Sequence, residues 1–458
     1  MNEIFKINDY YLDDTQIEAI KSDAKSTLVV AGAGSGKTLT ILGKIRYLIE
    51  VLKVKEYEIL CISFTNETVK SLVDKTKEMG YNLDVFTFHK LGLSLLGNVS
   101  IIEDNYLDYI IDEYFESFIK YTNDKFIKSI FFTDKNTDII YKTKEYYQLK
   151  KTISTFIRLA KSNNMGLNDF IKLYKKTFFN EKKIIKIIMD IYLIYKRECE
   201  SVNKIDFDDM IINSTQKVKD KNLYYKYIII DEFQDTSLVR YNLIHEIIKK
   251  CDSKIFVVGD DWQSIYRFSG CNLNIFVNFN QYFENTKIFH LKFTYRNSNE
   301  LIGVSSRFIM KNKKQLKKSI VSNKNLEKPI KILFGYTVND VINMIKDKDI
   351  LIIGRNNSDI ENIDWMNKLT IHRAKGLEAN NVILVNSDNI PSTIKNEKML
   401  RFVLNDKDYI PFEEERRLFY VALTRTKNCI YIIINKKISP FVKELIHDNK
   451  NRIEIIKK

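Results

Sequence analysis

The stretch TLVVAGAGSGKT occupies residues 27–38 and joins an apolar, β-branched run to a glycine-rich loop. The run at its start predicts a buried strand. The residues that follow, LTILGKIRYLIEVLK at 39–53, carry apolar side chains at helical spacing and predict a helix. A strand, a glycine-rich loop and a helix in this order indicate the beginning of a parallel α/β sheet.

The loop has the composition of a phosphate-binding site. Gly34 and Gly36 allow backbone N–H groups to point at phosphate oxygens. Lys37 can reach the β- and γ-phosphates of a nucleotide, and the Thr38 hydroxyl can hold Mg²⁺. The strict pattern has glycine where this chain has Ala31. The flanking strand and helix nevertheless favour a nucleotide site over a chance glycine-rich turn.

A second apolar run ends in two acids. The sequence YIIIDEFQD, residues 227–235, places Asp231 and Glu232 at the end of an expected strand. An acidic pair in this position is by itself usually a solvated strand end. Together with the phosphate-binding loop it predicts a hydrolysis site, in which Asp231 holds Mg²⁺ through water and Glu232 orients and deprotonates the attacking water.

Strand-like and helix-like runs alternate over most of the chain. Residues 97–200 differ, because amphipathic stretches such as DNYLDYIIDEYFESFIKY predict helices there. We therefore expect a helical insertion in the first sheet domain and a second α/β domain after it. The expected strands are 27–34, 58–66, 84–90, 225–235, 254–263, 286–293, 329–336, 349–355, 381–387 and 429–435.

Composition indicates the class of partner and the compartment. The 458 residues carry a formal net charge of +14, which favours a polyanion such as nucleic acid, although the Lys- and Ile-rich composition of an AT-rich genome gives the same charge. The five cysteines have no CxxC spacing, which fits a cytoplasmic protein without a zinc knuckle or disulfide framework. Because the N-terminus has no apolar signal core and no run approaches the ~20 apolar residues of a membrane helix, we expect no membrane partner.

Further motifs follow in a fixed order along the chain. They are LDDTQIEAI (12–20), CISFTNETV (61–69), VFTFHKL (85–91), KIDFDDMI (204–211), VVGDDWQSIYRFSG (257–270), FTYRNS (293–298), TIHRAKGLE (370–378) and EEERRLFYVALTRTK (413–427). With the loop and the acidic strand, this set resembles the UvrD/Rep branch of superfamily 1 DNA helicases. The DDWQ and YRFSG forms within residues 257–270 are most similar to helicase IV.

The resemblance implies an α/β fold of two RecA-like P-loop NTPase core domains with a helical insertion in the first. The implied divisions are 1–96 and 203–284 for core domain 1, 97–202 for the 1B-like insertion and 285–458 for the 2A-like core domain 2. Larger relatives have an accessory 2B domain before the TIHRAKGLE motif, but this chain has only about 14 residues there, too few for a domain. The segment 388–412 falls where relatives have a strand-separating element, and its apolar residues serve equally well as a wedge or as core.

The resemblance also implies roles around ATP and Mg²⁺. Gln263 would sense the γ-phosphate, and Arg296 and Arg425 would be arginine fingers from core domain 2, completing a catalytic set with Lys37 and Glu232. Thr38 and Asp231 would hold the metal. Relatives often have a basic residue in place of Leu39, so we expect looser selectivity for the base. The ATP-binding set comprises Gln16 for adenine, Ala31, Gly32, Ala33, Gly34, Ser35, Gly36, Lys37 and Thr38 for phosphates, Tyr295 stacked on adenine and Glu378 on the ribose.

DNA contacts are expected from aromatic side chains that stack on bases and polar ones that meet phosphates. For Phe64 and Phe268 core packing is the alternative, whereas Trp262 follows two acids and is expected to be accessible. Many relatives have aromatic-Arg-Gly where this chain has Phe268-Ser269-Gly270. The arginine of this chain is displaced to position 267, so the sequence does not decide whether an arginine contacts DNA here. The stacking candidates are Phe64, Trp262, Tyr266 and Phe268, and the phosphate-side candidates are Thr65, Asn66, Thr87, His89, Thr370, His372 and Arg373.

The activity implied by the resemblance is an ATP-dependent 3′→5′ helicase or translocase acting on single-stranded and tailed duplex DNA. The polarity comes from the resemblance alone. The missing accessory domain motivates an alternative, a DNA-stimulated ATPase subunit of a repair or anti-phage defence complex with a nuclease or repair partner. A DNA-binding protein with a decayed ATP site is less favoured because the catalytic side chains are all present, and an RNA substrate is conceivable since stacking does not exclude the 2′-hydroxyl.

Overall fold

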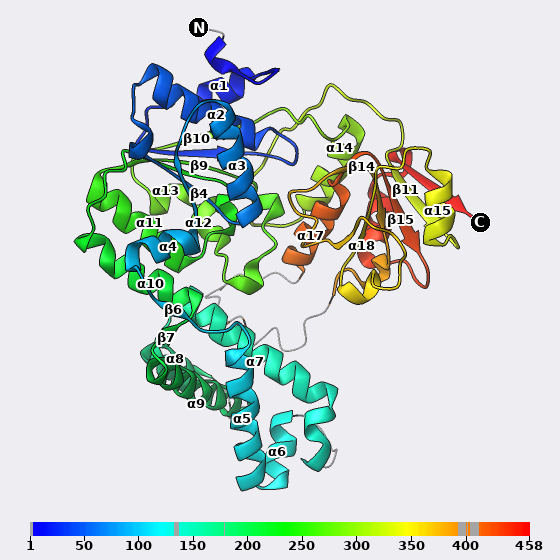
Figure 1. Ribbon diagram of the computed structural model, residues 1–458. Helices are drawn as coiled ribbons and strands as arrows, with labels where there is room; N and C mark the ends of the chain where they lie inside the picture. The colour runs from blue at the N-terminus through cyan, green and yellow to red at the C-terminus, as the bar shows by residue number, and fades with distance from the viewer. Residues whose placement is uncertain (1–2, 132–136, 178, 393–399, 401, 404–411) are drawn as a thin grey trace.

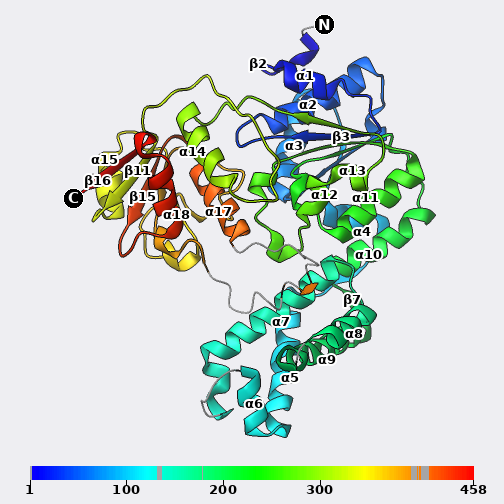
Figure 2. The same ribbon diagram turned by 180° about the vertical axis from the view of Figure 1, so that it is seen from behind.

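The structure is a computed structural model that describes residues 3–131, 137–177, 179–392, 400, 402–403 and 412–458 (Figure 1). Two α/β lobes lie side by side, and a group of helices extends away from them as an arm, as the views from both sides show (Figures 1 and 2). Within the described residues, no helix combines the length and the apolar character needed to cross a membrane.

The first lobe is built on a parallel six-stranded sheet of order β10-β3-β9-β8-β4-β5. Alternate residues of its strands pack on opposite faces, so Val29 and Leu28 of β3 belong to two separate apolar cores. The strands are β3 (Ser26–Val30), β4 (Ile59–Ser63), β5 (Asp84–Thr87), β8 (Tyr227–Ile230), β9 (Lys254–Gly259) and β10 (Thr286–His290). The helices are α1 (Asp14–Ile20), α2 (Lys37–Arg46), α3 (Asn66–Glu78), α4 (Phe88–Leu96), α10 (Phe207–Lys217), α11 (Leu238–Cys251), α12 (Leu273–Val277) and α13 (Phe279–Tyr282).

Strand β10 corrects the expected boundary at residue 285. The expected second core domain spans residues 285–458, but β10 pairs in parallel with β3, from Thr286 opposite Ser26 to His290 opposite Val30. The apolar pattern of residues 286–293 identifies a strand without identifying its neighbour. The first lobe therefore extends past residue 285, and the chain crosses to the second lobe only after β10.

The arm comprises helices α5–α9 with an apolar core of their own. Phe115, Phe156 and Phe170 are fully buried in it, and Val403 packs against the same core. Short strands β6 (Ser100–Ile101) and β7 (Lys204–Ile205) pair in parallel at its base. The segment 388–412, which the sequence offers as a wedge or as core, lies largely outside the described residues. The helices are α5 (Tyr106–Tyr121), α6 (Asp124–Phe131), α7 (Lys144–Ser162), α8 (Leu167–Lys176) and α9 (Phe179–Ser201).

The second lobe has a parallel six-stranded sheet of order β13-β12-β14-β15-β11-β16. Because β12 and β13 are neighbours, with Gly354 opposite Thr370, the residues between them form only a short connection. The strands are β11 (Ile330–Phe334), β12 (Ile350–Gly354), β13 (Lys368–Thr370), β14 (Ala379–Leu384), β15 (Thr426–Ile434) and β16 (Ile453–Lys457). The helices are α14 (Asn299–Ile309), α15 (Val338–Met344), α17 (Glu413–Leu423) and α18 (Pro440–Asp448).

Two short 3₁₀ turns after β9 place the coupling motif between the lobes. They are η7 (Asp261–Gln263), which packs against α17 of the second lobe, and η8 (Arg267–Ser269), which packs against α7 of the arm. The predicted fold class, two RecA-like α/β domains with a helical insertion, is confirmed. The carboxyl ends of β3, β8 and β9 gather at one edge of the first sheet, where ligands bind in open α/β sheets.

Candidate active site

The loop between β3 and α2 forms a cradle of backbone N–H groups. Gly34 and Gly36 have φ angles of 70° and 76°, the left-handed region that glycine adopts at least cost. Gly36 is also the N-cap of α2, so the unpaired N–H groups of the first helical turn adjoin the loop. Ala31 is fully buried and donates its N–H to Gly259 O at 2.8 Å, which needs no glycine. A loop of this kind before a helix N-terminus favours a phosphate group.

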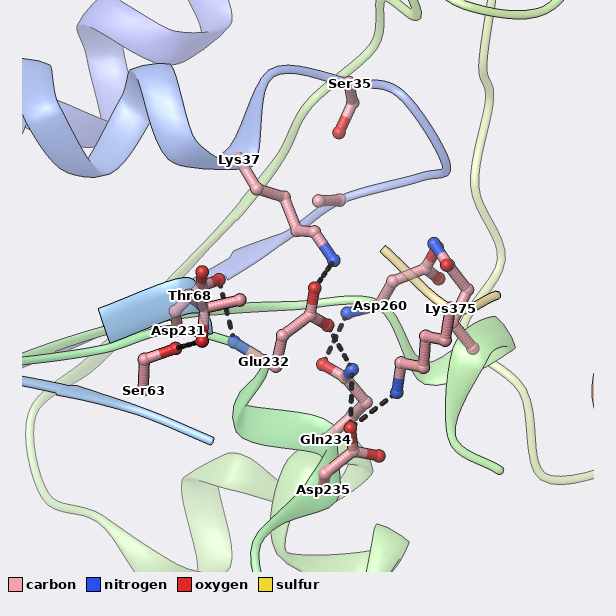
Figure 3. Close-up of polar contacts among 12 residues, drawn as sticks. Ser35, Lys37, Ser63, Thr68, Asp231, Glu232, Gln234, Asp235, Asp260 and Lys375 are labelled. Atoms are coloured by element: carbon pink, nitrogen blue, oxygen red, sulfur yellow. Dashed lines mark hydrogen bonds and ion pairs between the residues drawn. The ribbon is translucent and has the colours of Figure 1, made fainter. Parts of the chain in front are cut away.

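Lys37 and the acidic pair meet at the end of β8 (Figure 3). The Lys37 ammonium lies 2.6 Å from Oε1 of Glu232, and the Gln234 amide donates to Oε2 of Glu232 at 2.5 Å. Burial raises the pKa of Glu232, but Lys37 and Lys375 outweigh it and lower that pKa to about 2. Burial and the Glu232 charge raise the pKa of Asp231 to about 6. The two carboxyls therefore differ strongly in acidity, which suits two separate roles.

The oxygen atoms at this edge of the sheet fit Mg²⁺. The Thr38 hydroxyl and the carboxylates of Asp231 and Glu232 are hard ligands of the kind that Mg²⁺ uses together with retained waters. The raised pKa of Asp231 is that of a buried acid beside a second negative charge, and a bound cation would lower it. Among the described residues there is no cluster of three or more His, Cys, Asp or Glu side chains that could hold a metal. The hydroxyl and water would thus be needed to complete such a site.

Gln263 connects the first lobe to the second. Its Nε2 donates to Asp260 Oδ2 at 2.6 Å, and its Oε1 accepts from Nη2 of Arg425 at 2.9 Å. Arg425 follows α17 and is buried, with Nε donating to Val421 O and Nη1 to Leu377 O. The structure thus brings two of the predicted catalytic residues, 162 positions apart, into direct contact.

The segment around Arg296 lies directly on the phosphate-binding loop. Tyr295 donates its N–H to Gly34 O at 2.9 Å, and the Thr294 hydroxyl donates to Ala33 O at 2.7 Å. A Cβ added to Gly34 would lie 2.4 Å from the Cβ of Arg296, so this glycine also permits close packing. The Arg296 guanidinium pairs with Glu378 at 2.5 Å. Two residues with separate predicted roles are therefore bound to each other.

The predicted adenine-reading amide is occupied by partners within the chain. Gln16 is 1% exposed, and its Nε2 donates to Thr40 Oγ1 at 3.0 Å and to Gly36 O at 3.3 Å. Its Oε1 accepts the Asp13 N–H at 2.9 Å in a capping box for α1. Tyr295 is 60% exposed, and its hydroxyl donates to Asp13 Oδ2 at 3.0 Å. The exposed ring lies close to Gly36, where it can cover a base.

Aromatic side chains from both lobes meet near η8. Phe268 is 50% exposed, and its ring lies 5.5 Å from that of His372 and 6.1 Å from that of Tyr266. The Tyr266 hydroxyl donates to His372 O at 3.0 Å, which joins the two lobes. Phe64, on the first lobe, is half-buried against Phe88, with their ring centroids 5.4 Å apart. Phe268 is thus the most accessible of the four predicted stacking residues.

Trp262 contradicts the expectation that it is accessible. It is 0% exposed, its indole N–H donates to Leu316 O at 3.0 Å, and its ring packs edge-on against Tyr420. The residues that cover it come from segments far along the chain, so the local sequence carried no sign of burial. We therefore withdraw Trp262 as a base-stacking residue.

The predicted phosphate-side residues divide by exposure. Thr65 and Asn66 are exposed at the start of α3, whereas Thr87 is buried and caps α4 by accepting the Lys90 N–H. Thr87 contributes to helix geometry rather than to an open surface. Thr370, at the end of β13, is half-buried, and Arg373 is exposed.

The two histidines of the DNA-type motifs are both half-buried beside cations. Burial and Arg240 lower the pKa of His89 to about 4, and its ring lies 4.5 Å from that of Phe207. Burial, Arg355 and Lys375 lower the pKa of His372 to about 4. Both rings are neutral at pH 7, so each offers a hydrogen bond or a stacking face rather than a positive charge.

Comparison with known proteins decides the family. Residues 12–284 match the UvrD/REP helicase N-terminal domain, and residues 353–437 match the UvrD-like helicase C-terminal domain. The chain belongs to the UvrD/Rep helicase family. The resemblance read from the sequence motifs is thereby confirmed.

Named relatives cover most of this chain. It is 27% identical to DNA helicase IV of Escherichia coli, over 95% of this chain and 70% of that protein. It is 26% identical to ATP-dependent DNA helicase PcrA of Leuconostoc citreum, over 73% of this chain and 44% of the relative. It is 27% identical to ATP-dependent DNA helicase Rep of Buchnera aphidicola, over 74% and 50% respectively. The chain thus spans about half the length of the PcrA and Rep relatives.

Sequence reasoning missed several polar residues of this UvrD/Rep-type site. Lys375 forms a buried ion pair with Asp235 across the lobes, and Gln234 accepts the Asp260 N–H at 2.9 Å while holding Glu232 (Figure 3). Gln234, Asp235 and Lys375 lie inside motifs that the sequence displays. Their partners could not be read, because pairing across 140 residues leaves no local signal.

Proposed function

We propose that the chain is an ATP-driven motor that moves 3′→5′ along single-stranded DNA and separates the duplex ahead of it. The hydrogen bond between Gln263 and Arg425 is the observation that supports this most, because it joins the coupling motif to the second lobe. Hydrolysis that uses side chains from both lobes would change how the lobes meet in each turnover. The relatives named ATP-dependent DNA helicase PcrA and ATP-dependent DNA helicase Rep support the same class of activity.

In the proposed reaction Lys37 leaves Glu232 to bind the β- and γ-phosphates of ATP. Glu232, freed from the ammonium, regains basicity and accepts a proton from the attacking water. Thr38 and Asp231 would hold Mg²⁺, which neutralises phosphate charge. The backbone N–H groups of residues 32–38 that have no partner within the protein would bind the remaining phosphate oxygens, whereas the Ala31 N–H stays bonded to Gly259 O.

The second lobe would supply charge to the transition state. Arg425 and Arg296 carry guanidinium groups suited to the charge spread over the transferred phosphoryl group. Arg296 exchanges its partner Glu378 for phosphate, and Glu378 then accepts a ribose hydroxyl. Gln263 moves with Arg425 and reports the presence of the γ-phosphate to the DNA side. Tyr295 and the aliphatic Leu39 cover the base, and Gln16 contacts adenine by exchanging one of its present partners.

Single-stranded DNA would run across the junction of the two lobes. Phe268, Tyr266 and Phe64 stack on bases, a contact worth about 1–3 kcal/mol per base. The phosphate-side set is then Thr65, Asn66, His89, Thr370, His372 and Arg373, with the histidines as neutral donors. Thr87 keeps an indirect place in the proposal, since it fixes the start of α4, which carries His89.

A second candidate is a motor subunit that needs a partner to unwind. The connection between β12 and β13 supports it, because these adjacent strands leave no room in the chain for an accessory domain. A nuclease or another repair protein would then supply the strand-separating surface.

One experiment separates the two candidates. ATP hydrolysis is measured with and without single-stranded DNA, beside strand displacement on duplexes with a 3′ or a 5′ tail. Stimulated hydrolysis with displacement from the 3′ tail alone supports an autonomous helicase. Stimulated hydrolysis without displacement favours the motor subunit. ATP hydrolysis that single-stranded DNA does not stimulate would overturn both candidates.

A further inference from the structure

A segment between α14 and β11 returns to the first lobe and covers the coupling motif. We name residues 312–321 the return segment. Its Leu316 donates its N–H to Asp261 Oδ2 at 2.8 Å and accepts the Trp262 indole N–H at 3.0 Å. Its Ile320 lies against Gly32, where an added Cβ would be 2.5 Å from the Ile320 methyl. The return segment therefore contacts the phosphate-binding loop and the coupling motif at once.

Lys318 is the charged residue at the centre of these contacts. Its side chain is 3% exposed, and its ammonium donates to Ala31 O at 2.8 Å and to Asp260 Oδ1. The same ammonium lies 2.7 Å from Asp261 Oδ1 and 4.7 Å from the centre of the Trp262 ring. Both aspartate side chains are fully buried. One cation thus compensates two buried carboxylates and also holds a backbone carbonyl of the phosphate-binding loop.

Hydrogen bonds continue from this ammonium to both halves of the proposed active site. Asp260, which Lys318 holds through Oδ1, accepts from Gln263 through Oδ2, and Gln263 accepts from Arg425. The Asp260 N–H donates to Gln234, whose amide donates to Glu232 at 2.5 Å. Two intervening residues separate Lys318 from the proposed finger Arg425, namely Asp260 and Gln263. Two also separate it from the proposed base Glu232, namely Asp260 and Gln234.

We propose that Lys318 is a positioning residue for ATP hydrolysis, which orients Asp260 so that Gln263 and Arg425 face the γ-phosphate. The proposal rests on the proposed ATPase activity. Without the ammonium, two buried carboxylates face each other, and the favourable response is protonation or rotation of one of them. Rotation of Asp260 would release Gln263, which then no longer holds Arg425. Nucleotide affinity should persist, because Lys37 is unchanged and the loop stays anchored to β9 through the hydrogen bond from the Ala31 N–H to Gly259 O.

The test compares Lys318→Met with Lys317→Met, a matched change at the exposed neighbouring lysine. We expect Lys318→Met to lower kcat for DNA-stimulated ATP hydrolysis at least tenfold while KM for ATP stays within twofold, and Lys317→Met to change neither. The double variant Lys318→Met with Asp261→Asn removes one charge of each sign, so it keeps folding testable if the single variant is unstable. A purely structural clamp would instead lower the melting temperature and leave kcat per folded molecule intact.

Trp262 gives a second readout. The chain has two tryptophans and 26 tyrosines, so Trp365→Phe leaves Trp262, beside the Lys318 ammonium, as the single tryptophan, which is excited selectively outside the tyrosine absorption band. Addition of a non-hydrolysable ATP analogue should change its emission in the Lys318 protein and leave it unchanged in Lys318→Met. If the parent does not hydrolyse ATP, the proposed function fails and the proposal with it. If the parent hydrolyses ATP and both Lys318 variants keep its kcat, the positioning role alone is overturned.

Discussion

Lys37 and Glu232 form an ion pair 2.6 Å apart that the proposed hydrolysis must break. While the pair is intact, the ammonium helps to lower the pKa of Glu232 to about 2, which makes the carboxylate a weak base. A γ-phosphate competes for the same ammonium, so binding of ATP would release the carboxylate and raise its pKa. In the proposed reaction, the pair would therefore keep Glu232 a weak base until a nucleotide is present.

The change Glu232→Gln tests this arrangement. It preserves the shape of the side chain but cannot accept a proton, so ATP turnover should fall about 10²–10⁴-fold, the usual contribution of a general base. Binding of a non-hydrolysable ATP analogue should persist, as measured by equilibrium titration beside steady-state hydrolysis. Glu200→Gln, at an exposed acid near the end of α9, serves as the control and should keep full turnover. A Glu232→Gln protein that turns over like its parent would contradict the role.

Lys44 is a buried lysine of α2 that the proposed reaction does not use. Its ammonium donates to Ile20 O at 2.7 Å and to Ser22 O at 3.0 Å, and burial lowers its pKa from 10.5 to about 7. Between pH 7 and 9 the unfolded chain therefore binds more protons at this residue than the folded chain does. The contribution of Lys44 to the free energy of unfolding therefore rises with pH over this range.

The change Lys44→Met should remove that dependence. Between pH 7 and 9 the unfolding free energy of the parent should rise relative to that of the variant by about 2 kcal/mol, from the size of the pKa shift. Urea denaturation at the two pH values measures the difference. Lys249→Met, at an exposed lysine of α11, should show no such change. A difference between parent and Lys44→Met that stays constant with pH would disprove the depressed pKa.

The site residues show how far local sequence reaches. Lys37, Asp231 and Glu232 were predictable as neighbours, because each follows a strand of one parallel sheet and such strand ends meet at one edge. The burial of Trp262 was not predictable, because the return segment that covers it lies far along the chain: Leu316, which accepts the indole N–H, is 54 residues away. The buried position of Lys318 was not predictable for the same reason, since the local sequence does not distinguish it from exposed lysines nearby such as Lys317.

At the scale of elements, apolar runs predicted strands well and their neighbours poorly. Each of the ten expected runs overlaps an observed strand, and strands buried on both faces, such as β3, β4 and β12, leave the clearest apolar pattern. Strand β13 has only three residues, all half-buried, and β16 is buried only at its first residue, Ile453, so neither is marked by a buried apolar run. The place of β10 depends on the free edge of β3, which no local pattern encodes.

The turn η8 is the element that carries the proposed base stack. Phe268→Ala should lower the affinity for single-stranded DNA about 5- to 150-fold, the equivalent of 1–3 kcal/mol for one base stack. Fluorescence anisotropy with a labelled oligothymidylate at fixed salt, without nucleotide, measures this. Tyr121→Ala removes another exposed aromatic ring, 79% exposed at the end of α5, and should leave the affinity for single-stranded DNA unchanged. Equal affinity of Phe268→Ala and its parent would remove η8 from the DNA path.

At the scale of the whole molecule, one interface serves both proposed sites. The lobes are joined near the DNA side by the hydrogen bond from Tyr266 to His372 O and near the nucleotide side by that from Arg425 to Gln263. The arm touches the same region, since a Cβ on Gly270 would lie 2.2 Å from the Cβ of Ser162 in α7. A rotation of one lobe against the other would change both of these contacts between the lobes. In the proposed motor, this arrangement would couple ATP hydrolysis to movement on DNA.

The net charge of +14 and the state of the histidines together fix how DNA binding should respond to salt and pH. The logarithm of the affinity for single-stranded DNA should fall linearly with the logarithm of the salt concentration, with a slope of about −0.7 for each phosphate neutralised by lysine or arginine. His89 and His372, with pKa values lowered to about 4, stay neutral at both pH 8 and pH 6. The slope should therefore be the same at the two pH values.

Histidines with an ordinary pKa near 6.5 would be mostly charged at pH 6 and would steepen the slope by about 0.7 for each phosphate contact. Salt titrations at pH 6 and pH 8 decide between these outcomes, and a steeper slope at pH 6 would show that the histidines meet phosphates as cations.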